Sequence, residues 1–307
     1  MPPELTYDET WLFHHFTRHL GRWLDCTNAP RLFTLLVTEW AIESPVLGNA
    51  VMCFSARHQR KTSVAEEAYE RCISLLIDRL GMTSDSYDEC LLCAVLLLHF
   101  ADQLKSPTSH SFGDKRHLKG TSSILRASMP EGIIDPSATS LRDAAFWIYV
   151  RQSMYNATIS QEPLDIDFSL QLSPTVDDIR EEHPLDWLRR STAWANHILW
   201  TTATIANFCF SGSRLDNNGT SRAQVWQELW DKNQDWVARR PPDFDPLSHG
   251  PPMDGEPFDG IWFTADWHVI SHVFHHFSCI LLLRYKPDFK FTTRWVRAQL
   301  SPSDVCL

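Results

Sequence analysis

Residues 88–100, "DECLLCAVLLLHF", place two cysteines three positions apart inside a run of leucines. This pattern fits half of a zinc site, a redox pair or a buried helix. A tetrahedral zinc site needs a second pair of Cys or His ligands at short spacing, whereas Cys72 and Cys209 are distant in the sequence. Apolar surroundings also raise the pKa of a thiol and make it inert. We therefore expect Cys90 and Cys93 to be structural thiols in a helical core.

The composition of the chain agrees with a helical core around this segment. Of the 307 residues 43% are apolar, which permits a large core that needs neither a metal nor a disulfide to fold. Only 11 glycines occur, so helices are favoured over a turn-rich β architecture. We predict an all-α fold, a single domain of packed antiparallel helices.

Helix starts are marked by capping patterns. Ser44 before Pro45 predicts an N-cap with proline at the first helical position, followed by apolar residues at helical spacing. Two further patterns have the form of a capping box, and we expect the helices that they open to be antiparallel neighbours. These are Ser63 with Glu66 and Ser86 with Glu89.

Long helices and their connectors follow in the second half. Helical spacing predicts helices over 140–159, 186–210, 223–240 and 267–285, the first capped by Ser140 with Asp143 in its first turn. Polar, acidic or Ser/Asn/Gly-rich connectors occupy 105–120, 169–186 and 211–222. Residues 239–261 hold six of the 18 prolines, which predicts an extended excursion between two helices.

Charge and hydropathy exclude several classes of function. A formal net charge of −10 argues against binding nucleic acid through the overall field of the protein. The longest apolar run, 91–101, is too short to cross a bilayer, so we expect no membrane association. The first residues lack the features of a signal peptide. We therefore expect a protein that is not secreted, in a reducing compartment that keeps its eight cysteines as thiols.

Four histidines of the predicted helix 267–285 are candidate metal ligands. Their spacing puts three imidazoles on one helix face, as metal ligation requires. No glutamate accompanies them as in a zinc protease helix, and the neighbouring aromatic residues indicate packing. We favour the packing role for these residues, which are His268, His272, His275 and His276.

A cluster of carboxylates offers an enzymatic alternative. The stretch "DDIREE", 177–182, superficially resembles the aspartate-rich magnesium motif of class I terpene synthases, with Asp177, Asp178 and Glu181 as candidate ligands. It lies in a connector, however, and no second metal-binding motif follows. Nucleophile elbows, phosphate loops and dinucleotide fingerprints are absent from the sequence. We therefore assign no catalytic residue and expect a non-enzymatic protein without a cofactor.

A series of segments resembles, in order, the regulatory domain of fungal-specific transcription factors. The resemblance runs from Asp8 to Phe289 and depends on the order and spacing of the segments. The matching segments are "ETWLFHHFTRHLGRWLD", "SPVLGNAVMCFSARH", "AEEAYERCISLLI", "LLCAVLLLHFADQL", "HLKGTSSILR", "LRDAAFWIYVRQSMYNA" and "WANHILWTTATIANFCF".

The resemblance implies an all-helical regulatory domain over residues 8–289, between tails at 1–7 and 290–307, with a nuclear location. Members usually carry a six-cysteine zinc cluster that reads DNA, and that cluster is absent from this sequence. We therefore expect no direct nucleic-acid binding and a regulatory role through protein contacts, as a homodimer or a heterodimer with related factors. The alternative is small-molecule sensing, with an effector pocket among the Trp and Phe residues of 186–210 and 262–277.

Overall fold

The segment around Cys93 forms helix α6 (Glu89–Gln103), with Leu92, Cys93 and Leu96–Leu98 buried. The computed structural model places its N-cap at Asp88, whose carboxylate accepts hydrogen bonds from the amides of Cys90 and Leu91. The helix thus begins at Glu89, so Glu89 is not the third helical residue that the predicted capping box requires, and Ser86 itself lies outside the described residues. The reason is local, because the Asp88 carboxylate binds the free amides of the first turn directly.

The structure describes residues 5–81, 88–105, 116–128, 132–180, 183, 185–212, 221–252 and 255–287. Within these ranges the fold is all-α, and only four short strands accompany the helices. This confirms the predicted fold class. No helix of the described ranges is both long enough and apolar enough to span a bilayer. The predicted tail 290–307 and Glu181 lie outside the described residues.

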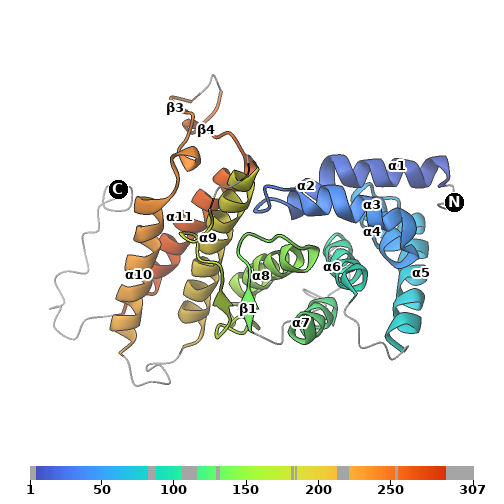
Figure 1. Cartoon of the computed structure of the whole chain (residues 1–307), viewed down its shortest axis with the longest axis horizontal. Coiled ribbons are helices and arrows are strands. Elements are labelled where there is room, and N and C mark those ends of the chain that lie inside the picture. Colours follow the sequence, from blue (N-terminus) through green and yellow to red (C-terminus); the bar gives the residue numbers. More distant parts are fainter. Residues whose placement is uncertain are drawn as a thin grey trace.

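The N-terminal elements form a layer at one end of the molecule (Figure 1). Ser44 accepts a hydrogen bond from the Leu47 amide and Pro45 is the first helical residue, which confirms the predicted start of α4. Helix α5 begins at Thr62, so Ser63 lies inside the helix and is not its cap. The elements are α1 (Tyr7–His15), the π-helical turn η1 (Phe16–Leu20), α2 (Gly21–Leu24), the π-helical turn η2 (Phe33–Val37), α3 (Thr38–Glu43), α4 (Pro45–His58) and α5 (Thr62–Gly81).

Helix α4 packs against both α5 and α6, whereas α5 and α6 touch each other little. The two helices that the sequence predicts as antiparallel neighbours therefore pack mainly on α4 and make only a small contact with each other. The small residues of α5 explain the arrangement, since Ala65, Ala68 and Cys72 are buried and let α4 approach closely. The Cys72 thiol donates to the carbonyl oxygen of Val46 in α4 at 3.3 Å.

The middle of the molecule is built on α8 (Leu141–Ser160) and α7 (Arg116–Ser128). The Ser140 hydroxyl accepts from the Asp143 amide and donates to the Asp143 carboxylate, which confirms the predicted cap of α8. Helix α7 begins inside the segment that the sequence predicts as a polar connector. Strands β1 (Ile133–Ile134) and β2 (Gln171–Leu172) pair in parallel and tie the segment after α8 to the residues before it.

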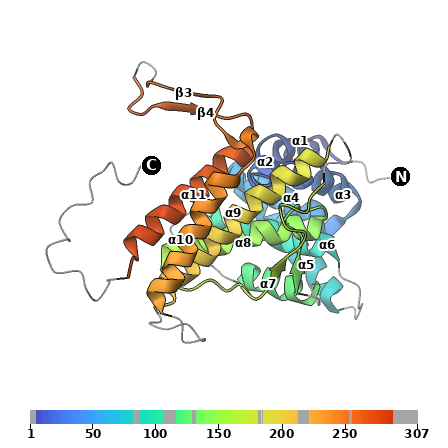
Figure 2. The same cartoon turned by 60° about the vertical axis from the view of Figure 1, so that its left-hand side comes forward.

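Three long helices lie side by side at the other end of the molecule (Figure 2). Two begin and end within one residue of the predicted bounds, and the third matches them. The proline-rich segment between the last two helices contains a short 3-10 helix and an antiparallel hairpin, so only part of it is irregular. The elements are α9 (Asp186–Phe210), α10 (Arg222–Arg239), η3 (Pro242–Phe244), β3 (Ser248–Gly250), β4 (Gly260–Trp262) and α11 (Asp266–Arg284).

One continuous apolar cluster runs from Phe13 to Leu282 and joins the N-terminal layer to the three long helices. Two buried tryptophans of α10 donate their indole N–H groups to backbone carbonyls, as burial of a polar group requires. Trp226 donates to Leu282 O at 2.8 Å, and Trp236 donates to Trp194 O at 3.1 Å. These bonds fix α10 against α9 and α11.

Candidate functional site

The four candidate histidines of α11 divide between its two faces. His268 and His275 are buried, His272 is half-buried and His276 is exposed. The buried face packs against α9 and α10. The spacing in the sequence therefore predicts correctly that three of these imidazoles share one face of the helix.

The inward-facing rings bind different neighbours. His268 Nδ1 lies 2.9 Å from Thr264 Oγ1, and His272 Nε2 lies 2.9 Å from the carbonyl oxygen of Phe244. His275 stacks on Trp236, with ring centroids 6.0 Å apart. These contacts hold the rings as packing groups.

Burial favours the neutral form of each of these imidazoles. It is the largest cause that lowers the pKa of His268 and His272, and it lowers the pKa of His275 to about 4. Neutral rings with protein partners suit the interior of a helix bundle. Among the described residues, no group of three His, Cys, Asp or Glu side chains is placed to hold a metal ion.

The carboxylates of the 177–182 stretch have protein partners of their own. Asp177 forms an ion pair with Arg239 of α10 at 2.6 Å, and Asp178 accepts hydrogen bonds from the amide and hydroxyl of Thr175. The Arg239 contact ties this exposed turn to the end of α10. Both carboxylates thus stabilise a surface connector in the part of the chain that the structure describes.

The cysteines of α6 lie where the leucine-rich context places them. Cys93 is fully buried and Cys90 is half-buried. Desolvation is the largest cause that raises the pKa of both thiols. They therefore behave as apolar core groups, which is the role that the sequence indicates.

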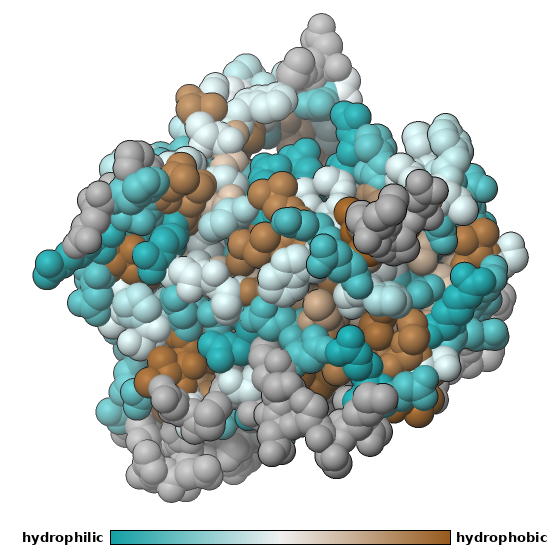
Figure 3. Space-filling model, turned by 45° about the vertical axis from the view of Figure 1, so that its right-hand side comes forward, coloured by the Kyte–Doolittle hydropathy of each residue, from teal (hydrophilic) through white to brown (hydrophobic). Residues whose placement is uncertain are grey.

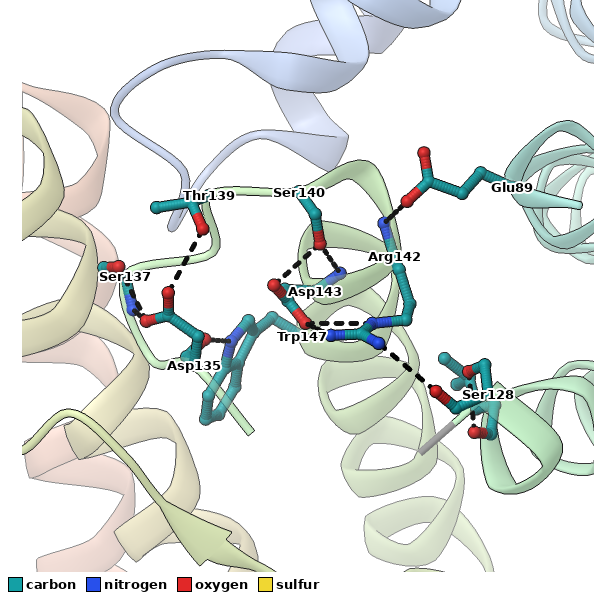
Figure 4. Close-up of polar contacts among 10 residues, drawn as sticks. Glu89, Ser128, Asp135, Ser137, Thr139, Ser140, Arg142, Asp143 and Trp147 are labelled. Carbon is teal, nitrogen blue, oxygen red and sulfur yellow. Dashed lines mark hydrogen bonds and ion pairs between the residues drawn. The ribbon is translucent and has the colours of Figure 1, made fainter. Parts of the chain in front are cut away.

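A polar network at the start of α8 joins three helices (Figure 4). The backbone amide of Arg142 donates to Glu89 of α6, and its guanidinium donates to Ser128 O of α7 and to the carboxylate of Asp143. Asp143 is only 3% exposed, so its negative charge needs these donors. Every drawn group has a partner within the protein, which indicates a structural role.

A cavity of about 370 Å³ lies between α7, α8 and the segment 161–170. Its wall combines apolar side chains with the hydroxyl groups of Ser122 and Tyr149 and an ion pair between Arg126 and Asp165 at 3.0 Å. The Tyr149 hydroxyl also donates to the carbonyl oxygen of Asp165. The cavity is large enough for a small ligand with apolar and polar parts. None of the Trp and Phe residues of 186–210 and 262–277, where the sequence analysis placed an effector pocket, lines this cavity, although Trp200 packs against its lining residue Phe146.

The outer face of α11 is the most regular exposed apolar feature. Val269, Val273 and Ile280 are 44%, 51% and 60% exposed. His276 lies between them and is exposed, and Leu283 continues the line as a half-buried residue. We call these five residues the outer seam of α11. The sequence analysis does not identify the seam, because it considers only the histidines of this helix.

Other apolar side chains are exposed in smaller groups. The β3–β4 hairpin, which projects from the body in Figure 2, carries exposed Ile261 and Trp262. Trp11 and Trp23 are exposed in the N-terminal layer. Figure 3 views the molecule from that side, and its hydrophobic residues lie in separate groups among hydrophilic ones. The outer seam differs from these groups because it follows one straight helix.

No protein-family model, curated protein or solved structure matches this chain. The resemblance to the regulatory domain of fungal transcription factors therefore stays a prediction.

Proposed function

We propose that this chain is a regulatory module of the fungal transcription-factor type that acts through protein contacts and does not bind DNA itself. Its nuclear location and its pairing with related factors belong to the same proposal. The ordered series of helical segments supports it, since all seven quoted segments fall within or overlap helices. The module is proposed to be non-catalytic, and its output is the recruitment or displacement of another protein.

The outer seam of α11 is the observation that carries the proposal. Apolar side chains gain free energy of roughly 25 cal/mol for each Å² removed from water, so a row of exposed valine and isoleucine favours a protein partner. A helix that lays its apolar side on another helix is a common mode of recognition. The seam is also rigid, because the opposite face of α11 is fixed by buried contacts with α9 and α10.

A reporter assay tests the proposal. The full chain is fused to a heterologous DNA-binding module, and transcription of a reporter is measured in a fungal host. We expect the wild-type fusion to change reporter output and the double variant Val273→Asp, Ile280→Asp to lose most of that effect. Ile77→Asp is the matched control, because Ile77 of α5 is 65% exposed and lies outside the seam. Equal output from both variants at equal protein level would contradict the proposal.

The cavity at Tyr149 favours small-molecule sensing as a second candidate function. A ligand that binds only the folded state raises the unfolding midpoint, so thermal-shift screening with metabolites is the direct test. A ligand should raise the unfolding midpoint of the wild type by more than about 2 °C. It should leave the midpoint of Leu125→Trp unchanged, because the larger side chain fills the cavity. Ile159→Trp on the exposed side of α8 is the control that should keep the response. Stabilisation of Leu125→Trp would place the ligand elsewhere.

A further inference from the structure

The N-terminal layer contains a second cluster of imidazoles, apart from the histidines of α11. His15 is the last residue of α1, and its Nε2 lies 3.0 Å from Nδ1 of His58, the last residue of α4. The ring centroid of His15 is 5.1 Å from that of His58 and 4.8 Å from that of His19. Two segments that are distant in the sequence therefore bring metal-ligating side chains together at one place.

The fold holds the first two rings in position. Both α1 and η1 pack on α4, and the indole of Trp23 meets the His58 ring edge-on, with ring centroids 5.1 Å apart. His15 and His58 are half-buried, whereas His19 is exposed. The π-helical turn η1 follows His15 and includes His19, and such turns are frequent at functional sites. The pair is thus fixed by packing and open to solvent, and the exposed His19 side chain has room to rotate.

The separation of the two paired nitrogens fits a shared metal ion. In a tetrahedral site with Zn–N bonds of about 2.0–2.1 Å, two ligand nitrogens lie about 3.3 Å apart and their ring centroids about 5 Å apart. The nitrogens of His15 and His58 are 3.0 Å apart, and their ring centroids are 5.1 Å apart. An ion that takes the place of the hydrogen between these nitrogens therefore widens the pair by only about 0.3 Å.

We infer that His15 Nε2 and His58 Nδ1 bind a divalent transition-metal ion, with zinc as the ion to test, and that His19 rotates to become the third ligand. Imidazole is a ligand that suits zinc, copper and nickel. Only two ligands are in place before the ion binds, which agrees with the lack of a preformed group of three ligands among the described residues. The site does not involve the outer seam, so the inference is independent of the proposed function.

The charges around the pair set its affinity. Burial is the largest cause that lowers the pKa of His15, and four basic neighbours add to it, which are His58, His19, Lys61 and His14. A lowered pKa favours the neutral imidazole, which is the form that binds a metal ion. The positive charge of Lys61, however, opposes a cation. We therefore expect a dissociation constant on the order of 10 µM, far weaker than that of a closed four-ligand site.

Isothermal titration calorimetry of the full chain with ZnCl2, at about pH 7.5 where free imidazoles are neutral, tests the inference. The wild type should bind one zinc ion at this site. His58→Asn and His15→Gln are the decisive variants, because each amide side chain keeps a hydrogen-bonding group near the nitrogen that it replaces. Each should weaken binding by at least about tenfold, since even the loss of an outer partner of a ligand costs that much. His19→Gln should also weaken binding, and an unchanged affinity would overturn its role as third ligand.

Two exposed histidines serve as matched controls. His14 lies beside the cluster, and His276 lies on α11 next to other histidines. His14→Asn and His276→Asn should leave the dissociation constant unchanged. Circular dichroism and unfolding midpoints without metal check that each variant folds as the wild type does. Equal zinc affinity of wild type and folded His58→Asn would overturn the inference, and so would a wild type that binds no zinc at about 500 µM.

Chemical protection locates the bound ion. Diethyl pyrocarbonate modifies the free nitrogen of a neutral imidazole, and a metal ion blocks the nitrogen that it occupies. Mass spectrometry after labelling with and without zinc should show slower modification of His15 and His58, with His276 unchanged. Protection of His272 and His276 instead would place the ion on α11 and overturn the inference.

Discussion

Asp25 carries a negative charge in a site that is almost closed to water. It is 4% exposed, and its carboxylate accepts hydrogen bonds from the Phe33 and Thr34 amides and from the Thr34 hydroxyl at 2.7–2.9 Å. Burial is the largest influence and raises the pKa of Asp25 to about 6. The hydrogen bonds and Arg151 act in the opposite direction, yet desolvation outweighs them.

The raised pKa of Asp25 makes stability depend on pH. A carboxyl with a higher pKa in the folded than in the unfolded chain stabilises folding fully when protonated, below about pH 4. That contribution is lost as the pH rises through about 6 and amounts to about 3 kcal/mol. Urea unfolding of the wild type and Asp25→Asn at several pH values measures it. The free energy of unfolding of the wild type minus that of the variant should fall by about 3 kcal/mol between about pH 3 and about pH 8, and a constant difference contradicts the assignment.

The buried thiols should resist modification. Burial raises the pKa of Cys53, Cys72 and Cys209 to about 12, and it raises the pKa of Cys93 well above the usual range. Thiolates are the reactive species, so these four residues should stay unlabelled in the native protein at about pH 8 and react fully in denaturant. Peptide mapping after alkylation measures each site. Rapid labelling of Cys93 in the native protein would show that its thiol is not buried in the core.

At the scale of elements, two glycines in helices have opposite roles. A Cβ at Gly48 of α4 would lie 2.7 Å from the carbonyl oxygen of Ala41 in α3. The space between α3 and α4 is therefore too small for a side chain at this position. At Gly120 of α7 the nearest neighbour, Val95 Cγ1, would lie at an ordinary 3.6 Å. Glycine at position 48 thus serves close packing, whereas at position 120 it only weakens its helix.

Alanine substitution separates the two roles. Gly48→Ala should lower the free energy of unfolding by about 1–3 kcal/mol through overpacking. Gly120→Ala should raise it by up to about 1 kcal/mol, because alanine has the higher helix propensity. Chemical denaturation of both variants beside the wild type measures the difference. Equal effects of the two substitutions would show that the backbone contact at Gly48 is relieved at no cost.

The helices were predictable where the pattern is local. The Ser44 and Ser140 caps and the bounds of 186–210 follow from neighbouring residues, and they agree with the structure. The packing partners do not follow from local pattern. Helix α4 contacts both α5 and α6, and the spacing of apolar residues in the sequence does not predict these contacts. The hairpin within the proline-rich segment depends on such pairing as well.

The outer seam shows why sequence alone could not locate the candidate site. Both faces of α11 are apolar, so hydrophobic periodicity does not show which face of the helix points to the interior. Two imidazoles, His268 and His275, lie on the buried face, where Thr264 just before the helix contacts the first and Trp236 of α10 stacks on the second. Val269 and Val273 are left outside. The apolar residues of this helix are readable from the sequence, but which of them are exposed depends on tertiary contacts.

At the scale of the whole molecule, long-range polar contacts hold the two ends together. Arg151 of α8 donates to Leu24 O at 2.6 Å and to Thr27 Oγ1 at 2.9 Å. Arg22 of α2 forms an ion pair with Asp266, at the start of α11, at 3.0 Å. The N-terminal layer is therefore tied to the helix that carries the outer seam, which gives that surface a fixed support.

The net charge of −10 opposes DNA binding by the whole chain, and a binding assay on the full chain tests this part of the proposal. Phosphate contacts need clustered lysine and arginine and weaken steeply with salt, whereas many arginines of the described ranges already pair with carboxylates, as Arg239 does with Asp177. Fluorescence anisotropy with a labelled duplex should show no saturable binding below about 10 µM protein at about 50 mM salt. A naturally basic DNA-binding domain is the positive control. Tight binding that falls sharply toward about 200 mM salt would reveal a local basic surface and overturn the view that this module acts through protein contacts alone.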